Sequence, residues 1–144
     1  KKQREVESLS AALGLSNRVE FKGSVSEEEK VTLYGSTLFT CMPSRFEGWG
    51  IAALEAGAAG KAVIGTNIPG LVDAIRPNET GILVPTENID ALANAMCKLL
   101  ENPDYRRRLG MAGRKWAESF TWDRVALEQE RVYEKIHKNT HSYD

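Results

Sequence analysis

The stretch that decides the fold runs from residue 38 to residue 61 and reads LFTCMPSRFEGWGIAALEAGAAGK. The apolar, β-branched and aromatic residues of Leu38–Met42 predict a buried strand, which Pro43-Ser44 ends. After a short loop, the small and apolar residues of Trp49–Ala59 predict a helix that is packed on most of its sides. Glu55 is the only charged residue of that helix, so we expect its carboxylate to have a specific partner.

Two glycines flank the start of the predicted helix, and they allow a ligand to approach the backbone closely. The unpaired N–H groups and the dipole of a helix N-terminus attract anions, so the end between Gly48 and Gly50 suits a phosphate. Glu55 lies four residues after Ile51, and Glu47 overhangs the same end from the loop. Carboxylates repel phosphate but accept hydrogen bonds from hydroxyls. The arrangement therefore predicts a ligand in which phosphate lies between two sets of sugar hydroxyls.

Simpler interpretations of the two carboxylates remain open. Ser44 and Glu47 match a helix capping box, in which Glu47 would bond only to the Ser44 amide. Glu55 would, in another interpretation, be a core carboxylate paired with a basic side chain such as Arg76 or Lys61.

A dinucleotide fingerprint of the Gly-x-Gly-x-x-Ala type also matches Gly48–Ala53, but its context is wrong. The fingerprint needs its first glycine directly after a strand and an acid after the next strand. Here five residues separate Met42 from Gly48, and Asn67 instead of an acid follows the next predicted strand. No Ser-His-Asp set, Cys/His metal spacing or P-loop is found in the sequence either.

The predicted elements alternate between strands and helices along the chain. Ser26 and Glu29 form a predicted capping box for the first helix after residue 22, and Asn88 and Thr121 are predicted caps of later helices. Such alternation predicts an α/β fold, with a parallel sheet covered by helices on both faces. The expected strands are 18–22, 38–42, 62–66 and 82–84, and the expected helices are 1–13, 27–34, 49–59, 71–75, 89–100, 105–119 and 123–136.

The composition is that of one domain with a modest charge. The chain has 144 residues, a net charge of −1 and interspersed acids and bases, which excludes a basic surface for nucleic acid. Two cysteines, Cys41 and Cys97, do not make a disulfide framework, so we expect a reduced, cytoplasmic setting. No apolar run is long enough to span a bilayer. We expect a Rossmann-like domain over residues 1–136 that lacks its N-terminal part, and a polar tail over residues 137–144.

The motif resembles the signature of a known enzyme family. Pro43-Ser44, followed by EGWGIAALEA from Glu47 to Ala56 and by Gly60, is similar to the signature of the retaining GT-B glycosyltransferases of family 4, the glycosyl transferases group 1. The similarity extends from about Arg18 to about Ile136. It implies one half of a two-domain architecture, the C-terminal donor-binding domain. The departures are Trp49, where many relatives have Phe, and Lys61-Ala62, where they often have a proline.

The resemblance also implies roles for individual residues. Glu47 would contact the donor sugar and stabilise the positive charge that develops near its anomeric carbon, and Glu55 would bind the ribose hydroxyls. Backbone amides would hold the sugar and the diphosphate at Gly48, Trp49, Gly50 and Ile51. The nucleobase would lie near Gly23, Ser24 and Val25, and the loop 67–70 would face the donor cleft.

The function expected from this resemblance is sugar transfer from a nucleotide-diphosphate sugar to an acceptor, with retention of the anomeric configuration, as in polysaccharide or glycoconjugate biosynthesis. No metal and no cofactor other than the nucleotide sugar is expected. The family's basic pair for the diphosphate and its acceptor domain would precede Lys1, so we expect this chain alone to be inactive and any membrane attachment to involve missing parts. The alternatives are a non-catalytic nucleotide-sugar-binding module and a nucleotide-sugar epimerase of the same architecture.

Overall fold

The computed structural model describes residues 2–140 of the chain. The chain forms two compact units, Lys1–Thr32 and Leu33–Asp144, and each is described here by itself. The elements are α1 (Lys2–Ala12), α2 (Glu27–Ser36), β1 (Phe39–Met42), α3 (Ile51–Ala58), β2 (Ala62–Thr66), α4 (Leu71–Ala74), β3 (Gly81–Val84), α5 (Ile89–Glu101), α6 (Pro103–Ala117) and α7 (Trp122–Thr140).

The first unit contains α1 and the start of α2. The predicted capping box is confirmed, because the Ser26 amide donates to Glu29 at 2.9 Å and the Glu29 amide donates to Ser26 Oγ at 3.2 Å. The predicted strand over residues 18–22 is wrong. The amides of Arg18 and Val19 donate to the Leu15 carbonyl in a turn, and no described strand pairs with this segment. An alternating pattern becomes a strand only when a neighbouring strand accepts its hydrogen bonds.

The second unit is built on a parallel three-stranded sheet of order β1-β2-β3, as the alternation of elements predicts. Phe39 lies opposite Ala62 in the first ladder, and Val63 lies opposite Gly81 in the second. All five residues of β2 are buried, which is typical of a central parallel strand. The residues of β1, expected to be buried, are half-buried because β1 is an edge of the described sheet.

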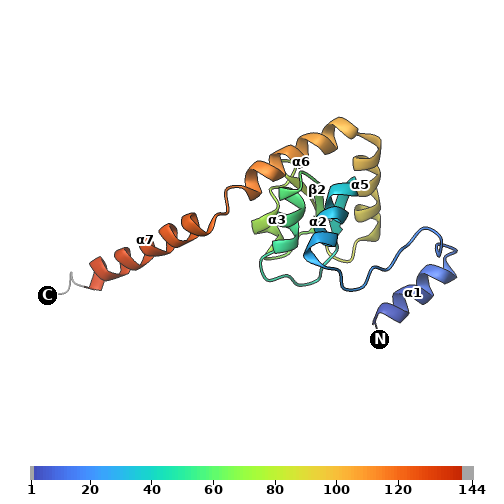
Figure 1. Ribbon diagram of the computed structural model, residues 1–144, viewed down its shortest axis with the longest axis horizontal. Helices are drawn as coiled ribbons and strands as arrows, with labels where there is room; N and C mark the ends of the chain where they lie inside the picture. The colour runs from blue at the N-terminus through green and yellow to red at the C-terminus, as the bar shows by residue number, and fades with distance from the viewer. Residues whose placement is uncertain (1, 141–144) are drawn as a thin grey trace. The chain divides into compact units, whose positions relative to one another are not determined.

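Helices cover both faces of this sheet, and successive residues of β2 face opposite layers. On one face Val63 packs with α3 and α4 in a cluster that includes Ala53, Ala56 and Leu71. On the other face Ala62 and Ile64 pack with α5 and α6, through side chains that include Leu99 and Leu109. Figure 1 shows α3 and α5 on either side of β2. The expected α/β fold, with helices on both faces of a parallel sheet, is therefore confirmed.

Helix α3 is fixed at its C-terminal end by glycine contacts with α6. A Cβ atom at Gly57 would lie 3.1 Å from the Gly113 carbonyl oxygen, and a Cβ atom at Gly110 would overlap the Gly60 carbonyl oxygen. These two helices therefore approach each other through backbone atoms, which only glycine permits. The C-terminal half of α3 is held in place by these contacts.

The later helices follow the sequence closely. The predicted caps are confirmed, since Asn88 Oδ1 accepts a bond from the Ala91 amide at 2.9 Å and Thr121 Oγ1 accepts one from the Arg124 amide at 3.2 Å. Helix α7 continues to Thr140, four residues beyond its expected end at Ile136. The rest of the expected tail, residues 141–144, lies outside the described residues. Among the helices described, none is long and apolar enough to cross a membrane.

Candidate functional site

The motif helix α3 starts at Ile51, two residues later than predicted, because Gly50 has a left-handed backbone. Its φ is 68°, a conformation that glycine adopts without strain. An added Cβ would also lie 3.0 Å from both the Gly70 carbonyl oxygen and Ala74 Cβ. The Gly50 carbonyl accepts bonds from the amides of Ala53 at 2.8 Å and Leu54 at 3.3 Å. The amides of the first two helical residues, Ile51 and Ala52, therefore have no carbonyl one turn earlier.

The backbone before the helix is ordered by Gly70. A Cβ atom on Gly70 would overlap the Glu47 carbonyl oxygen and would lie 2.9 Å from the Gly48 carbonyl oxygen. Both carbonyls therefore face Gly70. In a trans peptide the N–H group points opposite to its carbonyl, and the described chain contains no cis peptide. The amides of Gly48 and Trp49 consequently point away from Gly70, where they are available to an anion.

Gly48 itself leaves room beside these amides. It is exposed, and a Cβ atom built on it meets nothing within 4 Å. The site thus has open space at Gly48, outward amides at Gly48 and Trp49, and a helix end without a side-chain cap. This combination suits a bound phosphate.

Glu47 lies half-buried in the loop after β1. The capping-box interpretation of Ser44 and Glu47 is wrong, because these residues precede no helix and α3 begins only at Ile51. Glu47 is a loop residue that directly precedes Gly48 in the chain.

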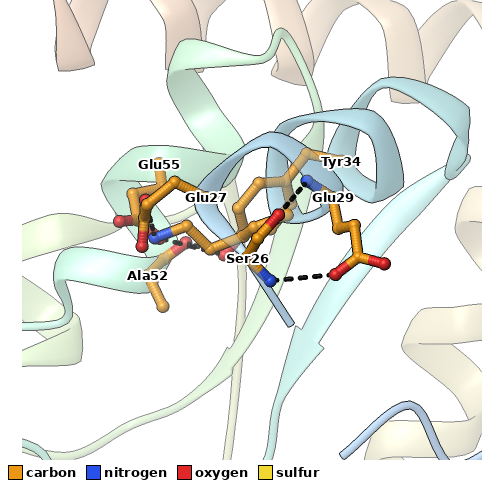
Figure 2. A network of polar contacts seen from close by, with 7 residues as sticks. Ser26, Glu27, Glu29, Tyr34, Ala52 and Glu55 are labelled. Atoms are coloured by element: carbon orange, nitrogen blue, oxygen red, sulfur yellow. Dashed lines mark hydrogen bonds and ion pairs between the residues drawn. The ribbon is translucent and has the colours of Figure 1, made fainter. Parts of the chain in front are cut away.

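Glu55 is half-buried on α3 and receives a hydrogen bond that the sequence did not indicate. The Tyr34 hydroxyl lies 3.3 Å from Glu55 Oε2 and 3.3 Å from the Ala52 carbonyl oxygen. Figure 2 shows the Tyr34 ring reaching α3 from α2. The single hydroxyl proton of Tyr34 is shared between these two acceptors, and the Glu55 carboxylate keeps further lone pairs for ligand hydroxyls.

The two basic residues considered as core partners of Glu55 are engaged elsewhere. Arg76 donates to Glu79 at 3.1 Å and lies 3.7 Å above the Trp116 ring. Lys61 donates to the Gly35 carbonyl at 2.8 Å. Neither Arg76 nor Lys61 is therefore the partner of Glu55, and the Tyr34 hydroxyl is one group that contacts its carboxylate.

The Trp49 side chain packs against Phe120, a contact that was not predicted from the sequence. Its ring contacts Phe120 edge-on, with centroids 5.4 Å apart, and Phe120 contacts Trp116 edge-on at 4.6 Å. The Trp116 indole N–H donates to the Ala74 carbonyl at 3.0 Å. Trp49, Ile51 and Glu55 also line a mainly apolar cavity of about 290 Å³ beside α3. These contacts fix the loop that carries the outward amides.

The residues expected near the nucleobase belong to the first unit. Gly23, with a φ of 64°, and Ser24 are exposed, and Val25 is half-buried, in the segment before α2. Their proximity to a nucleobase stays a prediction. Within residues 2–140, no group of three or more His, Cys, Asp or Glu side chains is placed to hold a metal ion.

The family model for glycosyl transferases group 1 matches residues 1–116 of the chain. The chain belongs to the glycosyl transferases group 1 family. It is 37% identical over 131 residues to MMP alpha-(1->4)-mannosyltransferase of Mycolicibacterium hassiacum, covering 90% of the chain and 32% of the relative. It is 34% identical over 128 residues to D-inositol 3-phosphate glycosyltransferase of Streptomyces scabiei, covering 89% of the chain and 29% of the relative. The chain thus spans about a third of the length of these relatives.

Solved structures with this architecture are GT-B glycosyltransferases and agree with the group 1 assignment. Sucrose-phosphate synthase of Thermosynechococcus elongatus is 34% identical, with a TM-score of 0.84 over 96% of this chain and 35% of that chain. Anabaena HepE, solved with UDP, is 21% identical, with a TM-score of 0.79 over 94% of this chain and 36% of that chain, and it shows the fold alone.

Proposed function

We propose that this group 1 chain is the donor-binding, C-terminal domain of a retaining family 4 glycosyltransferase that uses a nucleotide-diphosphate sugar. The observation that carries the proposal is the pair of outward amides at Gly48 and Trp49, held by Gly70 beside an uncapped helix end. Backbone amides at such an end stabilise negative charge without a counter-cation.

The proposed roles are those that the resemblance to family 4 implies for each group. The leaving diphosphate lies against the amides of Gly48, Trp49, Gly50 and Ile51. Glu47 accepts bonds from the donor sugar and stabilises positive charge at its anomeric carbon. Glu55, oriented by Tyr34, accepts bonds from the ribose hydroxyls. No metal is assigned to this site, because the amides provide the stabilisation of the diphosphate that a cation would otherwise supply.

The relatives support sugar transfer as the reaction of the whole protein. One is a mannosyltransferase and another an inositol phosphate glycosyltransferase, both above 30% identity. Acceptor binding by residues outside the present 144 is part of the proposal. By itself, we expect the chain to bind donor weakly and to transfer no sugar, and measurable turnover would contradict this expectation.

The experiment is a calorimetric titration of the chain with UDP, GDP and ADP and with the corresponding nucleotide sugars. Replacing Glu55 by Gln should weaken the binding of the nucleoside diphosphate and of the nucleotide sugar equally, because a bond to the ribose is common to both ligands. Replacing Glu47 by Gln should weaken only the nucleotide sugar. Each loss should be about tenfold to a hundredfold, corresponding to a charged hydrogen bond of about 1.5–3 kcal/mol.

Glu118→Gln is the matched control, because Glu118 pairs with Arg114 on an exposed face of α6. This variant should bind like the unmodified chain. If Glu55→Gln kept its nucleotide affinity while lowering the thermal midpoint, the ribose role would be wrong and Glu55 would be a structural carboxylate.

A further inference from the structure

A second cavity lies at the carboxyl ends of all three strands of the sheet. Its volume is about 350 Å³, and its lining includes Ser44 and Arg45 after β1, Thr66 at the end of β2, Glu87 after β3, and Ile89 and Leu92 of α5. Ligands of parallel α/β sheets bind beyond the carboxyl ends of strands. The cavity is therefore in the place where a ligand is expected, yet none of the donor-binding residues named above lines it.

Two opposite charges meet in the lining of this cavity. Arg45 Nη2 lies 2.8 Å from Glu87 Oε1, with side chains 83% and 66% exposed. An ion pair this exposed contributes little to stability. It does place guanidinium donors and carboxylate acceptors side by side at the opening.

The backbone at Glu87 has an unfavourable conformation. Its φ is 58°, a left-handed conformation that is unfavourable for a side chain other than glycine and is uncommon for glutamate. Strain of this kind persists where the surroundings or a function require the residue. Glycine would adopt this conformation without strain, so folding stability alone does not account for a glutamate at this position.

The rest of the lining includes a hydrogen bond between two strand ends and an apolar surface. Thr66 Oγ1 donates to the Ser44 carbonyl at 2.5 Å, which ties the loop after β1 to the end of β2. Ile89 and Leu92 supply apolar surface from α5. Apolar walls with a few polar groups are typical of small-molecule sites, and donors beside acceptors match ring hydroxyls, which both donate and accept. A phosphate would be repelled by Glu87, and the described lining has no aromatic ring for a nucleobase.

We propose that this cavity is a carbohydrate subsite in which Arg45 and Glu87 bind ring hydroxyls. Its assignment to the sugar end of the reaction rests on the proposed function, because Arg45 precedes Glu47 by only two residues in the same loop. The ring belongs either to the transferred sugar of the donor or to a sugar of the acceptor, and binding experiments separate these sources.

The first test uses the 144-residue chain, labelled with ¹⁵N, and free D-glucose, D-mannose and myo-inositol at millimolar concentrations. At least one sugar should shift the amides of Thr66 and Leu92. Arg45→Gln and Glu87→Gln should each weaken that sugar several-fold, while Glu118→Gln, which also breaks an exposed ion pair, should not. Equal affinity in all variants, or amides that stay unchanged with every free sugar and every nucleotide sugar, would overturn the subsite.

Glu87→Gly separates binding from folding. Glycine relieves the left-handed strain, so the thermal midpoint should rise while the sugar affinity falls several-fold. A variant that is stabilised and binds sugar as well as the unmodified chain would show that the carboxylate has no role in the cavity.

The second test compares UDP with UDP-glucose and GDP with GDP-mannose. Cavity shifts with a nucleotide sugar but not with its diphosphate assign the ring to the donor, whereas shifts with free sugar added to the diphosphate complex assign it to the acceptor. A chain that binds free sugar in the cavity but no nucleotide would overturn the proposed function. A chain that binds nucleotide while its cavity ignores every sugar would overturn the subsite alone.

Discussion

Replacing Gly70 by alanine tests whether this glycine fixes the backbone of Glu47 and Gly48. The new Cβ would overlap the Glu47 carbonyl oxygen and lie 2.9 Å from the Gly48 carbonyl oxygen, so the loop must move. The backbone at residue 70 has a φ of 86° and a ψ of −48°, which disfavours a side chain even without neighbours. We expect the first effect to cost about 1–3 kcal/mol and the second about 1–2 kcal/mol. The sum is a loss of about 2–5 kcal/mol of folding free energy.

Gly60→Ala is the matched comparison, because Gly60 has a φ of 72° but a Cβ atom added to it would meet nothing within 4 Å. It should therefore lose only the conformational part, about 1–2 kcal/mol. Urea unfolding of both variants, followed by circular dichroism, gives the two free energies, and calorimetry gives their nucleoside diphosphate affinities. Gly70→Ala should be the less stable and should also bind more weakly because its amides are displaced. Equal stability and equal affinity in the two variants would refute the reasoning.

Three further predictions concern the site and the cysteines. Tyr34→Phe removes a hydrogen bond to the half-buried Glu55, and urea unfolding should show a loss of about 1 kcal/mol; an unchanged midpoint would contradict the bond. Gly48→Ala should change stability by less than about 0.5 kcal/mol but weaken nucleotide sugars about tenfold in calorimetry, and full affinity would mean that no ligand occupies the open space there. Burial raises the pKa of the Cys41 thiol and so lowers the fraction that is thiolate, whereas Cys97 is exposed. Iodoacetamide should therefore label Cys97 first and Cys41 only at higher pH. Mass spectrometry after timed quenching checks this order, which equal rates at neutral pH would contradict.

The sheet could be predicted because its strands are short apolar runs between clear breaks. The expected strand 62–66 matches β2 residue for residue, and the run 82–84 differs from β3 only by Gly81. Caps were equally local, since a side chain at Asn88 or Thr121 bonds to an amide three residues later. These features depend on neighbours in sequence, which is the information that a single chain contains.

The features that were predicted wrongly or missed depend on residues far apart in the sequence. The start of α3 was misplaced because whether Gly50 is helical or left-handed depends on Gly70 and Ala74, about twenty residues later, which occupy the space beside it. Tyr34 was missed as the partner of Glu55 because the two are 21 residues apart, with no periodicity to connect them. The segment 18–22 has the alternation of a strand but lacks a described partner. The roles of Glu47, Glu55 and the glycines stay predictions, and the contacts that orient these residues could not be read from the sequence.

The glycine contacts between α3 and α6 have a consequence for protein engineering. Gly57 lies against the main chain of Gly113, and Gly110 lies against the main chain of Gly60. The C-terminal end of α3 is therefore held by main-chain contacts at these glycines. The segment 43–50 also contains Trp49, which packs on Phe120, so an exchange for the corresponding segment of another family member should retain Trp49 together with Gly50 and Gly70. Alanine at Gly110 should be strongly destabilising and alanine at Gly57 should require a small shift, whereas a Cβ atom at Gly113 would meet only ordinary contacts of 3.5–3.7 Å.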